Sequence, residues 1–235
     1  MRVLLAGDTH GSHSQIRYLL DTAVDKGVER IIQVGDFGFW PHLEDFHVQV
    51  NRAAMKAGID FYWLDGNHEN FDALEAEVDV DANEPQQMLA NLWYLPRGST
   101  WEWDGCRFMA LGGAFSIDKD DRTRGYSWWH QEIITYEQVD RACERGPVDV
   151  LLTHDAPEGT CPIIRPGYKY DEMSRGNRLA VSAVMEAVKP KLLVHGHYHH
   201  RYSGERDGVQ VEGLDRDGMW EHSWIGIDTD HWREP

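Results

Sequence analysis

Short apolar runs of strand length recur along the chain, and five of them end abruptly in glycine or in polar residues. Each run is nearly continuous in aliphatic or aromatic side chains, which is typical of a strand that is buried on both faces of a parallel sheet. Ligands bind beyond the carboxyl ends of such strands. The five runs are residues 2–6, 30–34, 59–64, 148–152 and 191–194.

Amphipathic segments separate these runs and predict helices over residues 15–26, 43–57, 136–144 and 179–188. Ser12 or Ser14 is the expected cap of the first helix, and Gly27 is its expected C-terminal stop. A strand, a helix and a second strand in this order predict a right-handed parallel crossover unit. The chain therefore belongs to the α/β class.

Other segments have a different pattern. Residues 71–91 mix helical and acidic character and predict a solvated face or lid, and residues 158–176 predict a long loop. Strand-like runs from Leu92 to Leu111 predict a β-meander, and residues 209–213 and 223–227 predict a closing pair of strands. No repeat, low-complexity tract or linker interrupts residues 1–235, which we expect to form one domain with two sheets.

The ends of the five runs carry residues that bind metals. Asp-x-His and His-x-His place two side chains on one side of an extended segment. Imidazole, carboxylate and amide groups together suit Mn²⁺, which we expect, or Fe, Zn, Ni or Co. Seven ligands are too many for one ion with an open position, so we expect two divalent ions that share the carboxylate of Asp36. The eight residues at these ends are Asp8, His10, Asp36, Asn67, His68, His154, His197 and His199.

The alternative is that each of these side chains is an ordinary polar residue at a strand end, which is the usual interpretation of a single histidine. Five runs that all end in ligand types make coincidence a poor explanation. His195 and His200 lie beside the candidates and are possible supports for them.

Composition narrows the function. The 235 residues include 40 acidic and 23 basic side chains, a formal charge of −17, which argues against an extended nucleic-acid platform. No apolar run has the length of a membrane span or a signal peptide. Three cysteines without metal-ligand spacing favour a reducing compartment, so we expect a cytoplasmic protein. The oligomeric state is not predicted.

Five sequence blocks resemble those of calcineurin-like metallophosphoesterases and occur in that family's order. They are Asp8-Thr9-His10, Gly35-Asp36, Gly66-Asn67-His68-Glu69, His154 and Gly196-His197-Tyr198-His199. The resemblance implies a four-layer α-β-β-α sandwich of two mixed sheets flanked by helices. It also implies a first ion on Asp8, His10, Asp36 and His199, and a second on Asp36, Asn67, His154 and His197. His68, with Asp36 and Asn67, is then expected to carry the catalysis, in which a hydroxide that bridges the metals attacks phosphorus.

This chain lacks two residues that the family's protein phosphatases carry, and their absence indicates which branch of the family it resembles. Those enzymes carry Gly-Asp-x-x-Asp-Arg-Gly, whereas this chain has Phe39 and Trp40 where the later Asp and the Arg would stand. The pattern is more similar to small phosphodiesterases such as class III cyclic-nucleotide phosphodiesterases. A diester carries less charge than a monoester and depends less on an added arginine. Trp40 is a candidate wall for a nucleoside, although packing is its more common role, and Arg122, Arg124, Arg165 and Arg175 are candidate substrate contacts.

We therefore expect a metal-dependent phosphodiesterase whose partner is a small anionic diester, such as a cyclic nucleotide or an aryl phosphodiester. A phosphomonoesterase or dinucleoside polyphosphate hydrolase is the alternative enzyme. A non-catalytic scaffold on the same fold is the alternative from another class, and the complete ligand set in this chain disfavours it.

Overall fold

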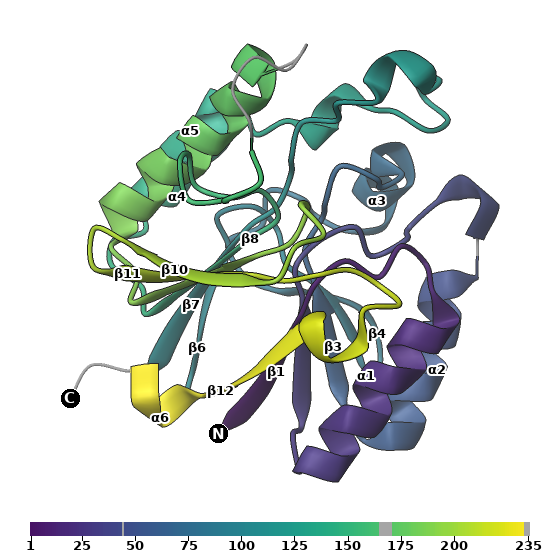
Figure 1. Ribbon diagram of the computed structural model, residues 1–235. Helices are drawn as coiled ribbons and strands as arrows, with labels where there is room; N and C mark the ends of the chain where they lie inside the picture. Colours follow the sequence, from purple (N-terminus) through teal and green to yellow (C-terminus); the bar gives the residue numbers. More distant parts are fainter. Residues whose placement is uncertain (44, 165–170, 233–235) are drawn as a thin grey trace.

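Two six-stranded sheets face each other in the computed structural model, which describes residues 1–43, 45–164 and 171–232 (Figure 1). Sheet A has the strand order β12-β1-β2-β3-β5-β4, and sheet B has the order β10-β11-β9-β8-β7-β6. In each sheet four parallel strands form the centre, and one antiparallel strand lies at each edge. Both sheets are therefore mixed.

Sheet A contains most of the N-terminal half of the chain and one C-terminal strand. Its strands are β1 (Arg2–Ala6), β2 (Arg30–Gln33), β3 (Asp60–Trp63), β4 (Gln86–Leu89), β5 (Leu92–Tyr94) and β12 (Trp224–Asp228). Sheet B follows with β6 (Thr100–Trp103), β7 (Cys106–Leu111), β8 (Val150–Thr153), β9 (Leu192–His195), β10 (Tyr202–Arg206) and β11 (Val209–Gly213).

Helices cover the outer faces of both sheets (Figure 1). The covering helices are α1 (His13–Lys26), α2 (Phe46–Ala57), α3 (Phe71–Glu77), α4 (Tyr136–Cys143) and α5 (Asp171–Val188). The short α6 (Thr229–Trp232) instead packs Trp232 against the core between the sheets. Short 3₁₀ turns occur at Pro41–Leu43, Lys119–Asp121, His130–Glu132 and Trp220–His222. Ser12 accepts a hydrogen bond from the Gln15 amide and caps α1, and Gly27 ends it with φ of 64°. No helix among the described residues combines the length and the apolar character needed to cross a bilayer.

Alternate side chains of the central strands enter different core layers. Leu4 of β1 packs under α1 and α2, whereas Leu5 packs between the two sheets. In sheet B, Leu152 lies between the sheets and Leu151 lies under α4 and α5. Both faces of each central strand are thus buried, which explains the continuous apolar runs in the sequence. The predicted four-layer α-β-β-α sandwich is confirmed.

Several local predictions were wrong, and each error has a physical reason. The predicted meander is divided, because β5 joins sheet A whereas β6 and β7 form a hairpin in sheet B. The predicted closing pair of strands is also divided, because β12 pairs with β1 and β11 pairs with β9 and β10. Strand order depends on contacts distant in sequence, which local patterns do not encode.

Two elements were missed or shortened for a different reason. The edge strand β4 lies in the segment read as helix and acidic lid, and its side chains are only partly buried, so no alternation marks it. Helix α5 begins at Asp171 rather than at residue 179. Its first two turns are polar, although Asn177 and Arg178 are buried there through hydrogen bonds. The prediction of one domain over residues 1–235 stays a prediction.

Candidate metal centre

Left-handed backbone conformations mark the loops beyond the strand ends. His10, Asp36, His197 and His199 have φ angles of 44°, 55°, 68° and 49°. This region is costly for residues other than glycine, and such residues gather at functional sites because the surrounding structure holds them there. Four candidate ligands in the disfavoured conformation indicate that the fold directs these side chains to one place.

Three glycines that precede candidate ligands permit close approach. A Cβ atom on Gly35 would lie 2.2 Å from His154 Nδ1, one on Gly66 would lie 2.1 Å from Asp36 Oδ1, and one on Gly196 would lie 2.1 Å from Asp8 Oδ1. No real side chain fits at these distances. The Gly-Asp, Gly-Asn-His and Gly-x-His motifs therefore owe their glycines to the packing of the site itself.

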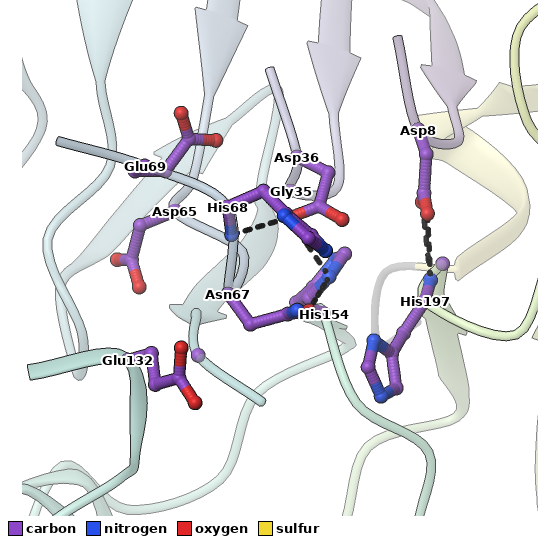
Figure 2. Close-up of polar contacts among 12 residues, drawn as sticks. Asp8, Gly35, Asp36, Asp65, Asn67, His68, Glu69, Glu132, His154 and His197 are labelled. Carbon is purple, nitrogen blue, oxygen red and sulfur yellow. Dashed lines mark hydrogen bonds and ion pairs between the residues drawn. The ribbon is translucent and has the colours of Figure 1, made fainter. Parts of the chain in front are cut away.

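The Asp36 carboxylate lies at the centre of the cluster and is 1% exposed. Its Oδ2 atom is 3.4 Å from His10 Nε2, and its Oδ1 atom is 3.4 Å from His154 Nε2. The backbone amide of His68 donates a hydrogen bond of 2.9 Å to Oδ1. The two oxygens of one carboxylate thus face two different histidines. Figure 2 shows Asp36 with His68 and His154.

The Asp8 carboxylate is fully buried and organises the other side of the cluster. Its Oδ2 atom is 3.1 Å from His199 Nε2 and 3.9 Å from His10 Nε2. The backbone amide of His197 donates to both Asp8 oxygens. Figure 2 shows Asp8 joined to His197. Ligand atoms of Asp8, His10 and His199 lie within 4.8 Å of one another, and so do those of Asp8, Asp36 and His154. Both groups fit a divalent ion by spacing and donor type.

Electrostatics at the cluster favour added positive charge. Burial acts against charge on Asp36, but the nearby His154 and His68 hold the pKa of this carboxyl well below its usual range. Burial would lower the pKa of His154, but Asp36 and Asp8 outweigh it and raise the pKa to about 10. The same carboxylates raise the pKa of His10 to about 9 against burial. A bound cation would take the place of these protons, because metal binding displaces protons from its ligands.

The remaining predicted ligands line the same site. Asn67 Oδ1 is 3.2 Å from His154 Nε2, and Asn67 Nδ2 donates to Ser116 Oγ at 2.9 Å, which turns the amide oxygen toward the cluster. The His197 ring centre is 5.1 Å from that of His154. Burial lowers the pKa of His197 to about 3, so its imidazole is neutral, the form that binds metals.

A cleft of about 640 Å³ opens beside the cluster, a volume typical of small-molecule sites. Asp36, His68 and His199 form its floor, and Ile117 and Ile163 contribute apolar walls. Arg178 also lines the cleft, but its guanidinium is paired with Glu158 and Asp171 at 2.6 and 3.3 Å. The cleft is large enough for a small molecule that touches the cluster.

Supporting residues were missed by the sequence reasoning. His10 Nδ1 is 2.9 Å from Asp217 Oδ1, a carboxylate 207 residues away. Glu69 is fully buried and accepts hydrogen bonds from the amides of Phe37 and Phe39, so it joins the loop after β3 to the loop after β2. Glu69 directly follows the Asn-His motif, and this position was the one feature of the sequence that could have indicated its supporting role.

The candidate supports and arginines have mixed outcomes. His195 is buried and bonds to Tyr202 rather than to a predicted ligand. The Arg122 guanidinium donates to the carbonyls of Asn67 and Ser127 and to Ser116 Oγ, so it holds loops together. Arg175 pairs with Glu158, Arg124 is exposed, and Arg165 lies outside the described residues. Phe39 packs in the core under sheet A, 5.8 Å from the Trp63 ring.

Comparisons with known proteins identify relatives of this chain. A lariat debranching enzyme of Entamoeba histolytica is 22% identical over 224 residues, and the match covers 88% of this chain and 59% of the relative. The chain thus spans less than two thirds of that relative.

Solved structures share the fold at low identity. A dimetal phosphatase from Danio rerio has a TM-score of 0.61 at 14% identity, over 96% of this chain and 91% of the other. Phosphopantetheinyl hydrolase from Mycobacterium tuberculosis has a TM-score of 0.57 at 15% identity, over 99% and 98%. The sequence profile of the calcineurin-like phosphoesterases matches residues 1–201, and the chain belongs to this family.

Proposed function

We propose that this protein is a dinuclear metal-dependent phosphodiesterase that hydrolyses small diesters, including cyclic nucleotides and aryl phosphodiesters. The observation that carries the proposal is the geometry of Asp36. Each of its carboxylate oxygens is 3.4 Å from a different histidine, His10 on one side and His154 on the other. A carboxylate with one oxygen toward each of two imidazoles is arranged to be shared by two ions.

The two proposed ions divide the remaining ligands between them. Asp8, His10 and His199 would hold the first ion with Asp36, which agrees with their mutual spacing. Asn67, His154 and His197 would hold the second ion with Asp36. The donor set of carboxylate, imidazole and amide fits Mn²⁺, with Fe, Zn, Ni or Co as alternatives. When bound, these ions supply Lewis-acid chemistry to the phosphoryl group and to the attacking water.

His68 is the proposed catalytic side chain outside the ligand set. It lines the cleft, and its backbone amide is fixed on Asp36 Oδ1. Burial lowers the pKa of His68, so its imidazole is neutral near pH 7. A neutral imidazole N–H donates a hydrogen bond to the leaving oxygen as negative charge develops there. Asn67, the preceding residue, would position His68, and its own amide oxygen would be available to the second ion.

Substrate charge supports a diester. A phosphomonoester carries an extra negative charge that a free guanidinium would balance. Arg178 is the only arginine among the described residues that line the cleft, and Glu158 and Asp171 neutralise its charge. Arg122, in the adjacent wall, is likewise held by protein acceptors. Because these arginines are paired, they leave little positive charge for the substrate. A diester, which carries less negative charge than a monoester, depends less on such charge.

The test uses the full chain supplied with Mn²⁺ and compares bis(p-nitrophenyl) phosphate with p-nitrophenyl phosphate. We expect faster diester turnover, and we expect His68→Ala to lower kcat by about 10²-fold or more without loss of bound metal. His200→Ala serves as the matched control, because His200 is a half-buried histidine near the centre outside the proposed ligand set. Faster monoester turnover would favour the phosphomonoesterase alternative. Absent turnover, or an unchanged rate in His68→Ala, would overturn the proposal.

A further inference from the structure

A second pocket lies directly beside the metal cleft and shares two residues, His68 and Asp118, with it. Its volume is about 300 Å³, at the lower end for small-molecule sites. Because His68 belongs to both pockets, a ligand whose phosphoryl group is at the metals reaches this pocket with its next chemical group. The other lining residues are Trp40, Pro41, His42, Arg122, Tyr126, Ser127 and Trp129.

The walls of this pocket are mainly aromatic rings. The Trp40 and His42 rings have centres 5.2 Å apart and planes inclined by 33°, so they form one broad surface. Trp129 is 5% exposed, and Tyr126 at the rim is 62% exposed. Exposed and half-exposed rings around a cavity are the usual platform for nucleobases, because every base has a flat π-face.

The pocket is held in place by the same contacts that hold the metal loops. Trp40 Nε1 donates a hydrogen bond to the carbonyl of His68. Arg122 donates to the carbonyl of Asn67 on one side and to that of Ser127 on the other. The aromatic wall therefore has a fixed position relative to His68, and little ordering is needed when a ligand enters.

One wall residue carries a buried polar atom without a partner. The indole Nε1–H of Trp129 is buried and has no acceptor among the described residues. A buried indole N–H normally finds an acceptor. In the wall of a ligand pocket, a ring nitrogen or exocyclic oxygen of a base would supply one, whereas a plain hydrocarbon ring would not.

We propose that this pocket is a nucleobase subsite, which makes the substrate class a nucleoside phosphodiester. The inference rests on the proposed diesterase activity and adds to it the group on one side of the scissile phosphate. The phosphoryl group lies at the metal ligands, and the attached ribose passes His68 and Asp118. The base stacks on the surface of Trp40 and His42, with Tyr126 at the rim.

The experiment compares adenosine 5′-monophosphate with ribose 5-phosphate, in which a hydroxyl replaces the base, as ligands of the Mn²⁺-loaded protein in titration calorimetry. We expect the nucleotide to bind about 10-fold more tightly. Tyr126→Ala should reduce that advantage about 5-fold and leave ribose 5-phosphate binding unchanged. Tyr136→Ala is the matched control, because Tyr136 is 88% exposed and lies on α4 outside the pocket.

A second variant tests the buried donor. Trp129→Phe keeps a ring in the wall and removes the N–H, and we expect it to weaken nucleotide binding about 5-fold with no change for ribose 5-phosphate. Equal affinities for the two ligands, or equal losses for both in Tyr126→Ala, would overturn the subsite. Because binding is read without turnover, an inactive protein that still prefers the nucleotide would refute the diesterase and leave the subsite standing. An active protein that binds the two ligands equally would refute the subsite and leave the diesterase standing.

Discussion

Replacing Arg97 with methionine should destabilise the whole fold, because Arg97 forms a buried ion pair beside the candidate metal centre. The Arg97 side chain is 5% exposed and the Asp65 side chain is 0% exposed. Arg97 donates from Nε and Nη2 to the same Asp65 oxygen at 2.9 and 2.5 Å. Asp65 directly precedes the Gly66-Asn67 turn, so this pair lies next to a proposed ligand.

The expected magnitude follows from leaving one charge buried. Removing one member of a buried pair typically costs about 3–5 kcal/mol, because the other charge stays desolvated. For a chain of this size, about 2–4 °C of melting temperature correspond to each kcal/mol, so the midpoint should fall by about 6–20 °C. Arg97 also bonds to the carbonyls of Glu132 and Ile133, so those acceptors lose their donor in the same variant.

Thermal unfolding of the metal-free chain, followed by circular dichroism, measures this shift. Arg141→Met is the matched control, because Arg141 pairs with Asp81 at 2.8 Å with side chains 26% and 66% exposed. An exposed pair of this kind contributes about 1 kcal/mol at most. The double variant Asp65→Asn with Arg97→Met should be more stable than Arg97→Met alone, because neither charge is then stranded. Equal midpoints for Arg97→Met and Arg141→Met would refute the reasoning.

Two further predictions concern metal content and pH. Asp36→Ala should abolish activity and lower bound Mn²⁺, measured by plasma mass spectrometry, by more than one ion per chain; a variant that keeps both ions would show that Asp36 is not shared. Burial raises the pKa of Glu132 to about 7 from the ordinary 4.5, so the folded protein binds a proton that the unfolded chain releases between these values. Stability of the metal-free protein should therefore fall as pH rises through this window, and Glu132→Gln should reduce that slope in denaturant titrations. Parallel pH curves for the two proteins would contradict the assignment.

The central strands and the residues at their ends were predictable from the sequence. Central parallel strands are buried on both faces, so β1, β2, β3, β8 and β9 appear as continuous apolar runs. Parallel strands that share a sheet end at the same edge, which brings their terminal residues together. The candidate ligands come from these ends, and the structure gathers them into one cluster. The closest distances between their side-chain atoms are 3.1–3.9 Å, and the His197 ring centre lies 5.1 Å from that of His154.

The residues that support the ligands were not predictable in the same way. Asp217 contacts His10 across 207 residues, from a loop between β11 and β12. That contact depends on β12 returning to the edge of sheet A beside β1, and the sequence pattern had placed this strand beside β11 instead. Ser116 and Glu132 similarly reach the centre through an irregular loop. Hydrogen-bonding residues in loops carry no periodic signal, so local patterns do not identify them.

The loop from Ser116 to Glu132 connects the two halves of the proposed function. Ser116 accepts from the Asn67 amide and from Arg122, and its hydroxyl donates to Glu132 Oε2 at 2.8 Å. This arrangement fixes which end of the Asn67 amide faces His154. The same loop supplies Tyr126 and Trp129 to the aromatic pocket. Because one loop orients a proposed metal ligand and forms the wall beside His68, replacing Ser116 should alter metal affinity and base preference together. Tyr126→Ala should alter base preference alone, and changes on α4 should alter neither.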